Sequence, residues 1–273
     1  MKIARVDIDG VPQWGVIRGD AIDLLQGSLP SWAPALTSDF TASMPFTGRT
    51  LPLDSARLMA PVEHRAKVIA LGTTYATHVA ELGHAMPDKP AAFLKPYECL
   101  IGPTDDIQYP ILTEQLDYEV ELVVVIGKAI RSGDEVSHAI LGYCVGNDVS
   151  ARDLQFGGSI AGMDFFSGKG LDDTSGIGPW ITTRDEFGDG KVDLELTLTV
   201  DGEVRQRDRT SSLAWEPSEL VEYAVARSRL SPGDVLFTGT PAGVALEDGR
   251  YLTRGQLVEA TIERLGSLYN TVV

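Results

Sequence analysis

The sequence predicts a mixed α/β fold that is rich in β-strands. Residues 116–127 form a run of β-branched and other apolar side chains that ends at a glycine, which is typical of a buried strand. Residues 192–204 alternate between apolar and polar side chains and turn at Asp201-Gly202, which predicts a hairpin. Residues 215–229 repeat apolar side chains at helical spacing, which predicts an amphipathic helix.

The composition indicates a globular protein with an acidic surface. The chain has 273 residues, of which 43% are apolar, so it can form one large domain with a small appendage and a sizeable core. Its 39 acidic and 23 basic side chains give a formal net charge of -16, which repels phosphate backbones and anionic lipid headgroups. We therefore expect neither nucleic acid nor a membrane as a partner.

The sequence also indicates the cellular compartment of the protein. No apolar signal core follows Met1, and no apolar run approaches the ~20 residues that span a bilayer, so we expect a soluble cytoplasmic protein. The chain has only two cysteines, Cys99 and Cys144, which are too few for a disulfide scaffold and are expected to be buried thiols.

Residues 1–60 are expected to form a small N-terminal α+β module, followed by a larger domain over residues 61–273. Two short alternating runs flank Asp9-Gly10, which predicts a hairpin. The sequence that follows, to about residue 52, is rich in proline and serine and predicts two short helices. No group of charged residues in this module suggests a reaction site, so its expected role is packing.

The segment from Lys67 to Gly83 predicts a short strand followed by a short helix that ends at the glycine. On this helix His78 and Glu81 are three residues apart, so they share a face and can form a hydrogen bond. A carboxylate raises the basicity of a histidine, as a general base that activates water requires. The alternative is a surface ion pair. Lys95 ends the next apolar run, either at the rim of a pocket or as an ordinary strand-end lysine.

The long apolar strand carries the first acidic cluster. Asp117, Glu119 and Glu121 are spaced two residues apart and therefore point to one face. Carboxylates held together on a buried strand repel one another and are costly to remove from water unless a cation neutralises them. Asp148 ends another apolar run and is well placed to join them, with Asp153 as an alternative third ligand.

Three carboxylates without cysteine or clustered histidine form an all-oxygen site. Such a site favours Mg²⁺, with Mn²⁺ or Ca²⁺ as alternatives, over Zn²⁺. The competing interpretation of Glu119 and Glu121 is a solvated acidic stripe on an edge strand. If Asp153 is not a ligand, we expect it to pair with Arg152.

Two further segments contain candidate groups. Residues 157–178 are rich in glycine and surround Lys169, which either delivers positive charge to an anionic substrate from a flexible loop or is a solvated loop lysine. Residues 236–244 form a strand that ends in a turn of small residues, whose hydroxyl and amide groups can hold a carboxylate or a developing oxyanion.

Taken in order, the motifs resemble those of the fumarylacetoacetate hydrolase family over residues 61–273. Each motif is weak alone, and their order makes the set specific. They are G-x-x-Y-x-x-H-x-x-E from Gly72 to Glu81, F-x-K-P from Phe93 to Pro96, D-Y-E-x-E-L from Asp117 to Leu122, N-D-x-x-A-R-D-x-Q from Asn147 to Gln155, Lys169 before Gly178-Pro179-Trp180, and T-G-T-P-x-G-V from Thr238 to Val244.

The resemblance implies a rolled, mixed β-sheet in the larger domain and a homodimer. It implies a divalent metal held by Glu119, Glu121 and Asp148, which favours Asp148 over Asp153 as the third ligand. The implied substrate is a small 2-oxo or 2,4-dioxo carboxylic acid, or a 2-hydroxy-dienoate, whose adjacent oxygens chelate the metal. Such acids arise in the breakdown of aromatic compounds.

The resemblance also implies roles for single residues. His78, with Glu81, takes a proton from water, and Lys169 stabilises the carbanion or enolate released when the C–C bond breaks. The helix that carries His78 is similar to a mobile lid of the family. Contacts with the substrate are implied for Tyr75, Lys95, Gln155 and Thr240.

Two positions depart from the residues usual in the family. Thr74 stands where relatives commonly carry asparagine, and Gly170 stands where serine is usual. We expect both to line the part of the pocket that recognises the substrate.

Three functional hypotheses follow. The first is a metal-dependent hydrolase that cleaves a C–C bond in an acylpyruvate-like acid. The second keeps the site but makes the protein an isomerase or a decarboxylase of a related acid. The third is a non-catalytic protein that binds a cation such as Ca²⁺ for stability, in which the His78–Glu81 pair has no function.

Overall fold

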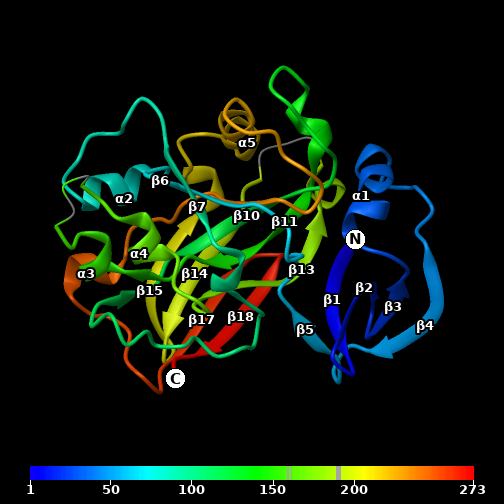
Figure 1. Cartoon of the computed structure of the whole chain (residues 1–273), viewed down its shortest axis with the longest axis horizontal. Coiled ribbons are helices and arrows are strands. Elements are labelled where there is room, and N and C mark those ends of the chain that lie inside the picture. The colour runs from blue at the N-terminus through cyan, green and yellow to red at the C-terminus, as the bar shows by residue number, and fades with distance from the viewer. Residues whose placement is uncertain (159, 161, 189–191) are drawn as a thin grey trace.

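The structure is a computed structural model of the whole chain and describes residues 1–158, 160, 162–188 and 192–273. It has a mixed α/β fold in which strands dominate, as the sequence predicts (Figure 1). None of the helices in these described ranges is both long enough and apolar enough to cross a bilayer.

The larger sheet has 12 strands within the described residues. Its main path follows the order β4-β3-β2-β1-β13-β11-β10-β16-β6-β7, and β5 and β8 pair with β1 and β13 beside that path. Its strands are β1 (Lys2–Ile8), β2 (Val11–Arg18), β3 (Ala21–Leu25), β4 (Phe46–Pro52), β5 (Arg57–Met59), β6 (Val68–Gly72), β7 (Ala91–Lys95), β8 (Leu100–Ile101), β10 (Val120–Ile126), β11 (Ile140–Asn147), β13 (Ser175–Thr183) and β16 (Val235–Phe237).

A second sheet follows the order β15-β14-β17-β18. Its strands are β14 (Glu195–Val200), β15 (Glu203–Arg209), β17 (Leu257–Ile262) and β18 (Gly266–Thr271), and a separate short pair is formed by β9 (Leu116–Asp117) and β12 (Ser150–Ala151). The α-helices are α1 (Leu29–Ser38), α2 (Ala76–Glu81), α3 (Arg152–Gln155), α4 (Phe165–Lys169), α5 (Pro217–Val225) and α6 (Ala245–Asp248). Short 3-10 helices cover Tyr97–Cys99, Val136–Ala139, Arg184–Phe187 and Thr210–Ser212.

The N-terminal strands extend the larger sheet at one end of the molecule, away from α2, α3 and α4 (Figure 1). The hairpin predicted at Asp9-Gly10 is present between β1 and β2, and both turn residues have positive φ angles of 53° and 81°. The prediction of two short helices before residue 52 is wrong. That segment forms β3, α1 and β4, because β3 pairs with β2 of the hairpin and β4 pairs with β3, which widens the sheet.

The predicted long acidic strand is present but interrupted. β9 ends at Asp117, and β10 starts at Val120. At the break the main-chain N–H of Glu119 donates to Oδ1 of Asn147 at 2.9 Å, and that of Val120 donates to Oε1 of Gln206 at 2.9 Å. Side-chain acceptors therefore take donors that a continuous strand would pair with main-chain carbonyls.

The strand β10 is buried along its whole length, as predicted, because it separates two apolar cores. The face that carries Leu122 and Val124 packs in one core with residues of β14, β17, β18 and α5. The face that carries Val123 and Val125 packs in the other core with residues of α1, β11 and β16. The N-terminal module thus contributes α1 to the packing of the larger sheet.

Four strands of the larger sheet bring their ends to one edge. β10 begins beside the end of its antiparallel neighbour β11 at Asn147. On its other side β10 pairs antiparallel with β16, which ends at Phe237. β6 runs parallel to β16 and ends at Gly72. The start of β10 and the ends of β11, β16 and β6 therefore meet, and the segments beyond these ends carry the candidate site residues.

Two elements of the second half differ from prediction mainly in their bounds. The hairpin at Asp201-Gly202 is present, with positive φ angles of 51° and 81°, but its first strand begins at Glu195. The amphipathic helix is shorter than residues 215–229. It starts at Pro217, because a capping box between Glu216 and Glu219 closes its first turn.

Candidate active site

Three buried carboxylates meet at the edge where the strand ends converge. Glu119 precedes β10, Glu121 is its second residue, and Asp148 follows β11. One oxygen atom from each residue lies within 4.8 Å of the others. Asp153, the alternative third ligand, accepts a hydrogen bond from the Thr113 hydroxyl instead. The structure therefore brings together Glu119, Glu121 and Asp148.

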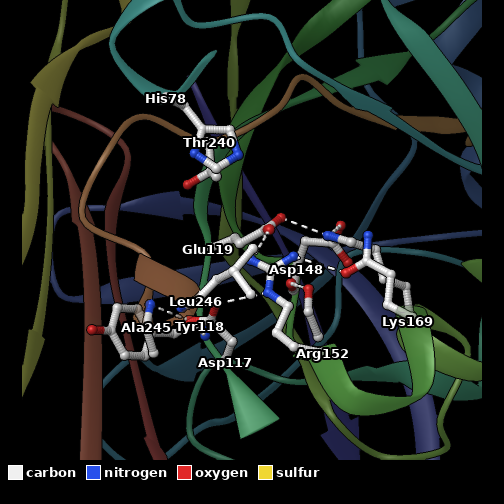
Figure 2. A network of polar contacts seen from close by, with 12 residues as sticks. His78, Asp117, Tyr118, Glu119, Asp148, Arg152, Lys169, Thr240, Ala245 and Leu246 are labelled. Carbon is white, nitrogen blue, oxygen red and sulfur yellow. Dashed lines mark hydrogen bonds and ion pairs between the residues drawn. The ribbon is translucent and has the colours of Figure 1, made fainter. Parts of the chain in front are cut away.

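Among the described residues, three buried cations contact these carboxylates. Nζ of Lys169 lies 2.6 Å from Oε2 of Glu119 and 2.7 Å from Oδ2 of Asp148 (Figure 2). Nζ of Lys95 lies 2.5 Å from Oδ1 of Asp148. Arg152 donates to Oε1 of Glu119 at 2.5 Å. Both oxygens of Glu119 and both oxygens of Asp148 thus have a cationic partner.

The prediction of a loop around Lys169 is wrong. Lys169 is the last residue of α4, and its side chain is buried. The preceding residue, Gly168, allows this position, because a Cβ there would lie 2.5 Å from Cβ of Gln155 on α3. Gly168 therefore allows the close packing of α4 on α3.

The predicted pairing of Arg152 with Asp153 is also wrong. Nε of Arg152 donates to Oδ2 of Asp117 at 2.7 Å, and another of its nitrogens donates to Oε1 of Gln155 at 2.9 Å. Asp117 also accepts the main-chain N–H of Ala245 at 2.8 Å. Asp117 therefore lies outside the carboxylate cluster and holds Arg152 against it, as Figure 2 shows.

The surroundings shift the pKa values of two of the carboxylates in opposite directions. Burial acts to raise the pKa of Glu119, but the positive charges of Lys169 and Arg152 outweigh burial and lower this pKa to about 2. Glu121 has no ion-pair partner among the described residues and accepts one main-chain N–H at 2.7 Å. Burial, followed by the negative charges of Asp148 and Glu119, raises the pKa of Glu121 well above its usual value.

The donor set fits a divalent metal ion. Four carboxylates, counting Asp117, face three cations, so one negative charge is left without a partner. Glu121 is the carboxylate that lacks a cation, and it lies within reach of the other two oxygen ligands. Buried carboxylate oxygens are the ligands that Mg²⁺, Mn²⁺ and Ca²⁺ prefer.

The predicted His78–Glu81 pair forms on α2. Nδ1 of His78 lies 3.4 Å from Oε2 of Glu81, and the two side chains are 10% and 20% exposed. The other oxygen of Glu81 accepts the main-chain N–H of Gly243 at 2.8 Å, which joins α2 to the turn after β16. The pair is therefore not the surface ion pair considered as the alternative.

One cavity of about 410 Å³ joins His78 to the carboxylates. In Figure 2, His78 and Thr240 lie on one side of Glu119, and Arg152 and Lys169 lie on the other. The polar residues that line this cavity are His78, His84, Glu119, Glu121, Asp148, Arg152, Gln155, Lys169, Thr73 and Thr240.

Of the four predicted substrate contacts, two line the cavity. Gln155 and Thr240 belong to its wall. Lys95 contacts Asp148 without lining the cavity. Tyr75 is fully buried outside the lining, and its hydroxyl has no hydrogen-bond partner among the described residues.

The prediction that Thr74 and Gly170 line the substrate pocket is wrong, because neither belongs to the cavity wall. Thr74 is fully buried, and its hydroxyl donates to the carbonyl oxygen of Thr238 at 2.7 Å. A Cβ at Gly170 would lie 2.6 Å from the carbonyl oxygen of Phe166. Both positions therefore serve local packing.

Sequence reasoning missed Gln206, which connects the start of β10 to the turn after β16. Its Oε1 accepts the N–H of Val120, and its Nε2 donates to Oγ1 of Thr240 at 2.9 Å and to the carbonyl oxygen of Pro241 at 3.0 Å. Gln206 lies beyond the alternating run that predicts the hairpin. Only its inward position on an extended β15, where it is buried, could have indicated it.

Two family models match the chain. The model described as "Fumarylacetoacetate (FAA) hydrolase C-terminal" matches residues 67–273, and the model described as "Rv2993c-like, N-terminal" matches residues 1–61. Protein Rv2993c of Mycobacterium tuberculosis is 42% identical over 231 residues, which cover 84% of this chain and 83% of the relative.

Solved structures that are similar over the whole chain include the following two. The 5-carboxymethyl-2-hydroxymuconate delta-isomerase from Mycobacterium smegmatis is 36% identical, with a TM-score of 0.80 and coverage of 100% of this chain and 99% of that chain. The fumarylacetoacetate hydrolase from Exiguobacterium antarcticum is 32% identical, with a TM-score of 0.82 and coverage of 100% and 99%. The names of similar proteins thus include a hydrolase and an isomerase.

Proposed function

The chain belongs to the fumarylacetoacetate hydrolase family, and we propose that it is a divalent-metal-dependent hydrolase that cleaves a C–C bond in an acylpyruvate or a related 2,4-dioxo acid. The observation that carries this proposal is that His78, which is paired with Glu81, lines the same cavity as Glu119, Glu121 and Asp148. Hydrolysis needs a group that activates water and a site that holds the acid, and this cavity contains candidates for both.

Glu119, Glu121 and Asp148 are the residues proposed to hold the metal. When bound, a divalent ion supplies a Lewis acid that polarises the 2-oxo group and orients the adjacent oxygens of the substrate. With such an ion in place, the single negative charge of the cluster becomes a single positive charge. A positive site at the base of the cavity then attracts the carboxylate of the substrate.

His78 is the proposed general base. Its Nδ1 faces Glu81, so Nε2 is the nitrogen that takes a proton from water. The resulting hydroxide adds to the acyl carbonyl carbon, and the bond from that carbon to the neighbouring CH₂ group breaks. The electron pair of this bond forms the enolate of pyruvate. Lys169 stabilises the negative charge, and the proton on His78 passes to the CH₂ carbon, so the products are a carboxylic acid and pyruvate.

Gln155 and Thr240 are proposed to orient the substrate. The hydroxyl of Thr240 donates to the carbonyl oxygen of Val120 at 2.9 Å and accepts from Gln206 at 2.9 Å. We therefore assign its contact with the substrate to the main-chain N–H. Oε1 of Gln155 accepts from Arg152, and its amide nitrogen lies 3.9 Å from Sδ of Met163, so we assign the second hydrogen of the amide to the acid. We assign Lys95 and Tyr75, which lie outside the cavity lining, to the support of Asp148 and of the core.

An isomerase or decarboxylase is the second candidate function. The similarity to a protein named as an isomerase, at a TM-score of 0.80 over the whole chain, favours this possibility. The same residues would bind a 2-hydroxy-dienoate or another 2-oxo acid, and the enolate would be reprotonated or formed by loss of CO₂. The two functions differ in whether His78 must activate water.

Product analysis in ¹⁸O-labelled water separates these reactions. The panel contains acetylpyruvate, fumarylpyruvate, a hydroxymuconate-type diene acid and oxaloacetate, each with Mg²⁺. Hydrolysis predicts pyruvate and a carboxylic acid that carries one ¹⁸O atom from water. An isomer of unchanged mass or the release of CO₂ would favour the second candidate. Tight Mg²⁺ binding without turnover of any acid would favour the third hypothesis, a cation site that only stabilises the fold.

We also infer a homodimer. Large apolar side chains are exposed on the described surface, among them the neighbours Ile111 at 97% and Leu112 at 67%, and a second copy would bury such groups. Sedimentation at micromolar concentration tests this inference, and a monomer would contradict it. The cytoplasmic location stays a prediction.

A further inference from the structure

We propose that the substrate has a single carboxylate and an uncharged, apolar acyl group. This inference rests on the proposed function, because it concerns the acyl end of the same acid. The cavity has two chemically different parts: the carboxylate cluster with its cations forms one, and the remaining wall is largely apolar. The charged part holds the 2-oxo acid, so the apolar part surrounds the acyl group.

Two stacked aromatic rings belong to the apolar wall. The ring centroids of Phe93 and Phe165 are 4.5 Å apart, and the ring planes differ by 11°. Phe93 lies on β7 and Phe165 on α4, so two separate elements fix the pair. Leu82 and Met163 are further apolar residues of the cavity lining. An apolar group placed here removes both its own surface and the surface of the wall from water.

The helix α4 links this wall to the reacting end. Its first residue, Phe165, belongs to the wall, and its last residue, Lys169, contacts Glu119 and Asp148. Nζ of Lys169 lies 5.7 Å from the ring centroid of Phe93. The acyl group of an acid held at the carboxylate cluster therefore has the Phe93–Phe165 pair beside it.

The cations of the cavity are already engaged at the charged part. Arg152 donates to Asp117, Glu119 and Gln155, and Lys169 contacts two carboxylates. No other Lys or Arg belongs to the described lining. The sequence between Phe156 and Met163, Gly-Gly-Ser-Ile-Ala-Gly, adds none. A second carboxylate on the substrate would therefore be removed from water without a cation to receive it.

One further ionisable side chain lines the cavity without an ion pair among the described residues and belongs to a segment distant in sequence from the carboxylates, and this is His84. It is exposed to solvent in the segment that follows α2. A contact with an exposed imidazole is screened by water and salt, so it offsets little of the cost of burying a carboxylate. If any residue of the lining binds a second carboxylate, it is His84, so the experiment includes a His84 variant.

The test compares two acids of the same length, butanoylpyruvate and succinylpyruvate, which differ by a terminal methyl group against a terminal carboxylate. We measure kcat/KM for both acids with the Mg²⁺-loaded protein. Calorimetry gives the affinity of both acids for the same preparation. We expect a preference for butanoylpyruvate on the order of 10²-fold, because an unpaired carboxylate in an apolar site is strongly disfavoured.

A matched pair of variants tests whether the preference for butanoylpyruvate arises at the apolar wall of the cavity. Phe165→Arg places a cation beside the acyl group and should lower the preference by about tenfold or more. Phe166→Arg is the control, because the next side chain on the same helix is 73% exposed and outside the cavity lining. If Phe165→Arg does not fold, Met163→Arg serves instead, because that side chain lines the cavity and is 52% exposed.

Equal rates and affinities for the two acids, or a preference for succinylpyruvate, would overturn the proposal. Loss of a succinylpyruvate preference in His84→Ala would then identify His84 as the group that binds the second carboxylate. If neither acid is cleaved, the proposed hydrolase function is wrong. The calorimetric affinities still decide between the apolar and the charged acyl group in that case.

Discussion

The ammonium nitrogen of Lys169 lies 2.6 Å from Oε2 of Glu119, so a carboxylate proposed to bind a metal already has a cation beside it. The same nitrogen lies 2.7 Å from Asp148, the second of the three proposed ligands. Burial acts to lower the pKa of Lys169, but Asp148 and Glu119 outweigh burial and raise it, so this lysine stays charged. Lys169 and the proposed metal therefore have two carboxylates in common, Glu119 and Asp148.

Lys169→Met tests the contact of Lys169 with Glu119 and Asp148 through the free energy of unfolding. Without the ammonium, Glu119 and Asp148 are buried with less compensation, so the EDTA-treated variant should lose about 3–5 kcal/mol of unfolding free energy. Mg²⁺ should stabilise the variant more than it stabilises the parent protein, because it supplies the missing positive charge. Urea unfolding with EDTA and with Mg²⁺ measures both effects. Lys128→Met, at an exposed lysine after β10, is the control, and equal losses in the two variants would contradict the account.

Glu119→Gln should abolish Mg²⁺ binding, because it removes the charge of one of three proposed ligands. Asp148→Asn should have the same effect, and Asp153→Asn should leave the affinity unchanged, since Asp153 hydrogen-bonds to Thr113 outside the cluster. Titration calorimetry on the three variants gives the comparison. Unchanged Mg²⁺ affinity in Glu119→Gln, or a loss confined to Asp153→Asn, would disprove the assigned ligand set.

Mg²⁺ affinity should rise with pH over the range in which Glu121 ionises. Burial and the neighbouring carboxylates raise the pKa of Glu121 in the metal-free protein, so it keeps its proton above the range of an ordinary carboxyl group. A divalent ion needs the carboxylate, so binding releases this proton. Calorimetry in two buffers with different ionisation enthalpies counts the protons released. Affinity that does not change from about pH 5 to pH 8 would contradict this prediction.

The metal-free protein should show the opposite trend in stability. Because the pKa of Glu121 is raised on folding, its contribution to stability is fully present below the unfolded pKa and is lost as the pH rises through the folded pKa. In EDTA the melting temperature should therefore decline as the pH rises, because Glu121 ionises in the folded protein. Added Mg²⁺ should reduce or reverse this decline, and identical pH profiles with EDTA and with Mg²⁺ would contradict the role of Glu121.

His78→Ala should lower hydrolysis by ~10²–10⁴-fold, the usual contribution of a general base, and leave Mg²⁺ affinity unchanged. The chain offers a matched control in His138, whose Nδ1 lies 3.4 Å from Glu135 at the same spacing of three residues. The His138 pair is exposed, and it lies outside the lining of the active-site cavity. His138→Ala should therefore keep full activity. An unimpaired rate in His78→Ala would remove His78 as the base.

Local patterns predicted Glu119 and Glu121 but left Asp148 and Asp153 open as the third carboxylate, and the family resemblance favoured Asp148. Glu119 and Glu121 alternate along a strand whose two faces are both apolar further on, and Asp148 ends a second apolar run. The spacing of His78 and Glu81 likewise predicts their contact within one helix. In each case the contact lies within a single element or beside the end of a buried strand.

Contacts between distant segments could not be predicted in this way. The packing of α4 on α3 depends on Gly168, and the sequence shows only that the segment is rich in glycine. Arg152 binds Asp117, 35 residues earlier in the chain, and no local pattern favours that partner over the adjacent Asp153. Gln206 joins segments from three parts of the chain, so its role appears only in the folded structure.

Metal-dependent release of pyruvate from an acylpyruvate decides whether the protein is the proposed hydrolase. The protein is treated with EDTA, divided, and incubated with acetylpyruvate or butanoylpyruvate, with and without Mg²⁺ or Mn²⁺. The account predicts pyruvate and an equal amount of the carboxylic acid when metal is added, and neither product with EDTA alone. Equal pyruvate release in the presence of EDTA, or metal-dependent turnover to an isomer or CO₂ without a carboxylic acid product, would contradict it.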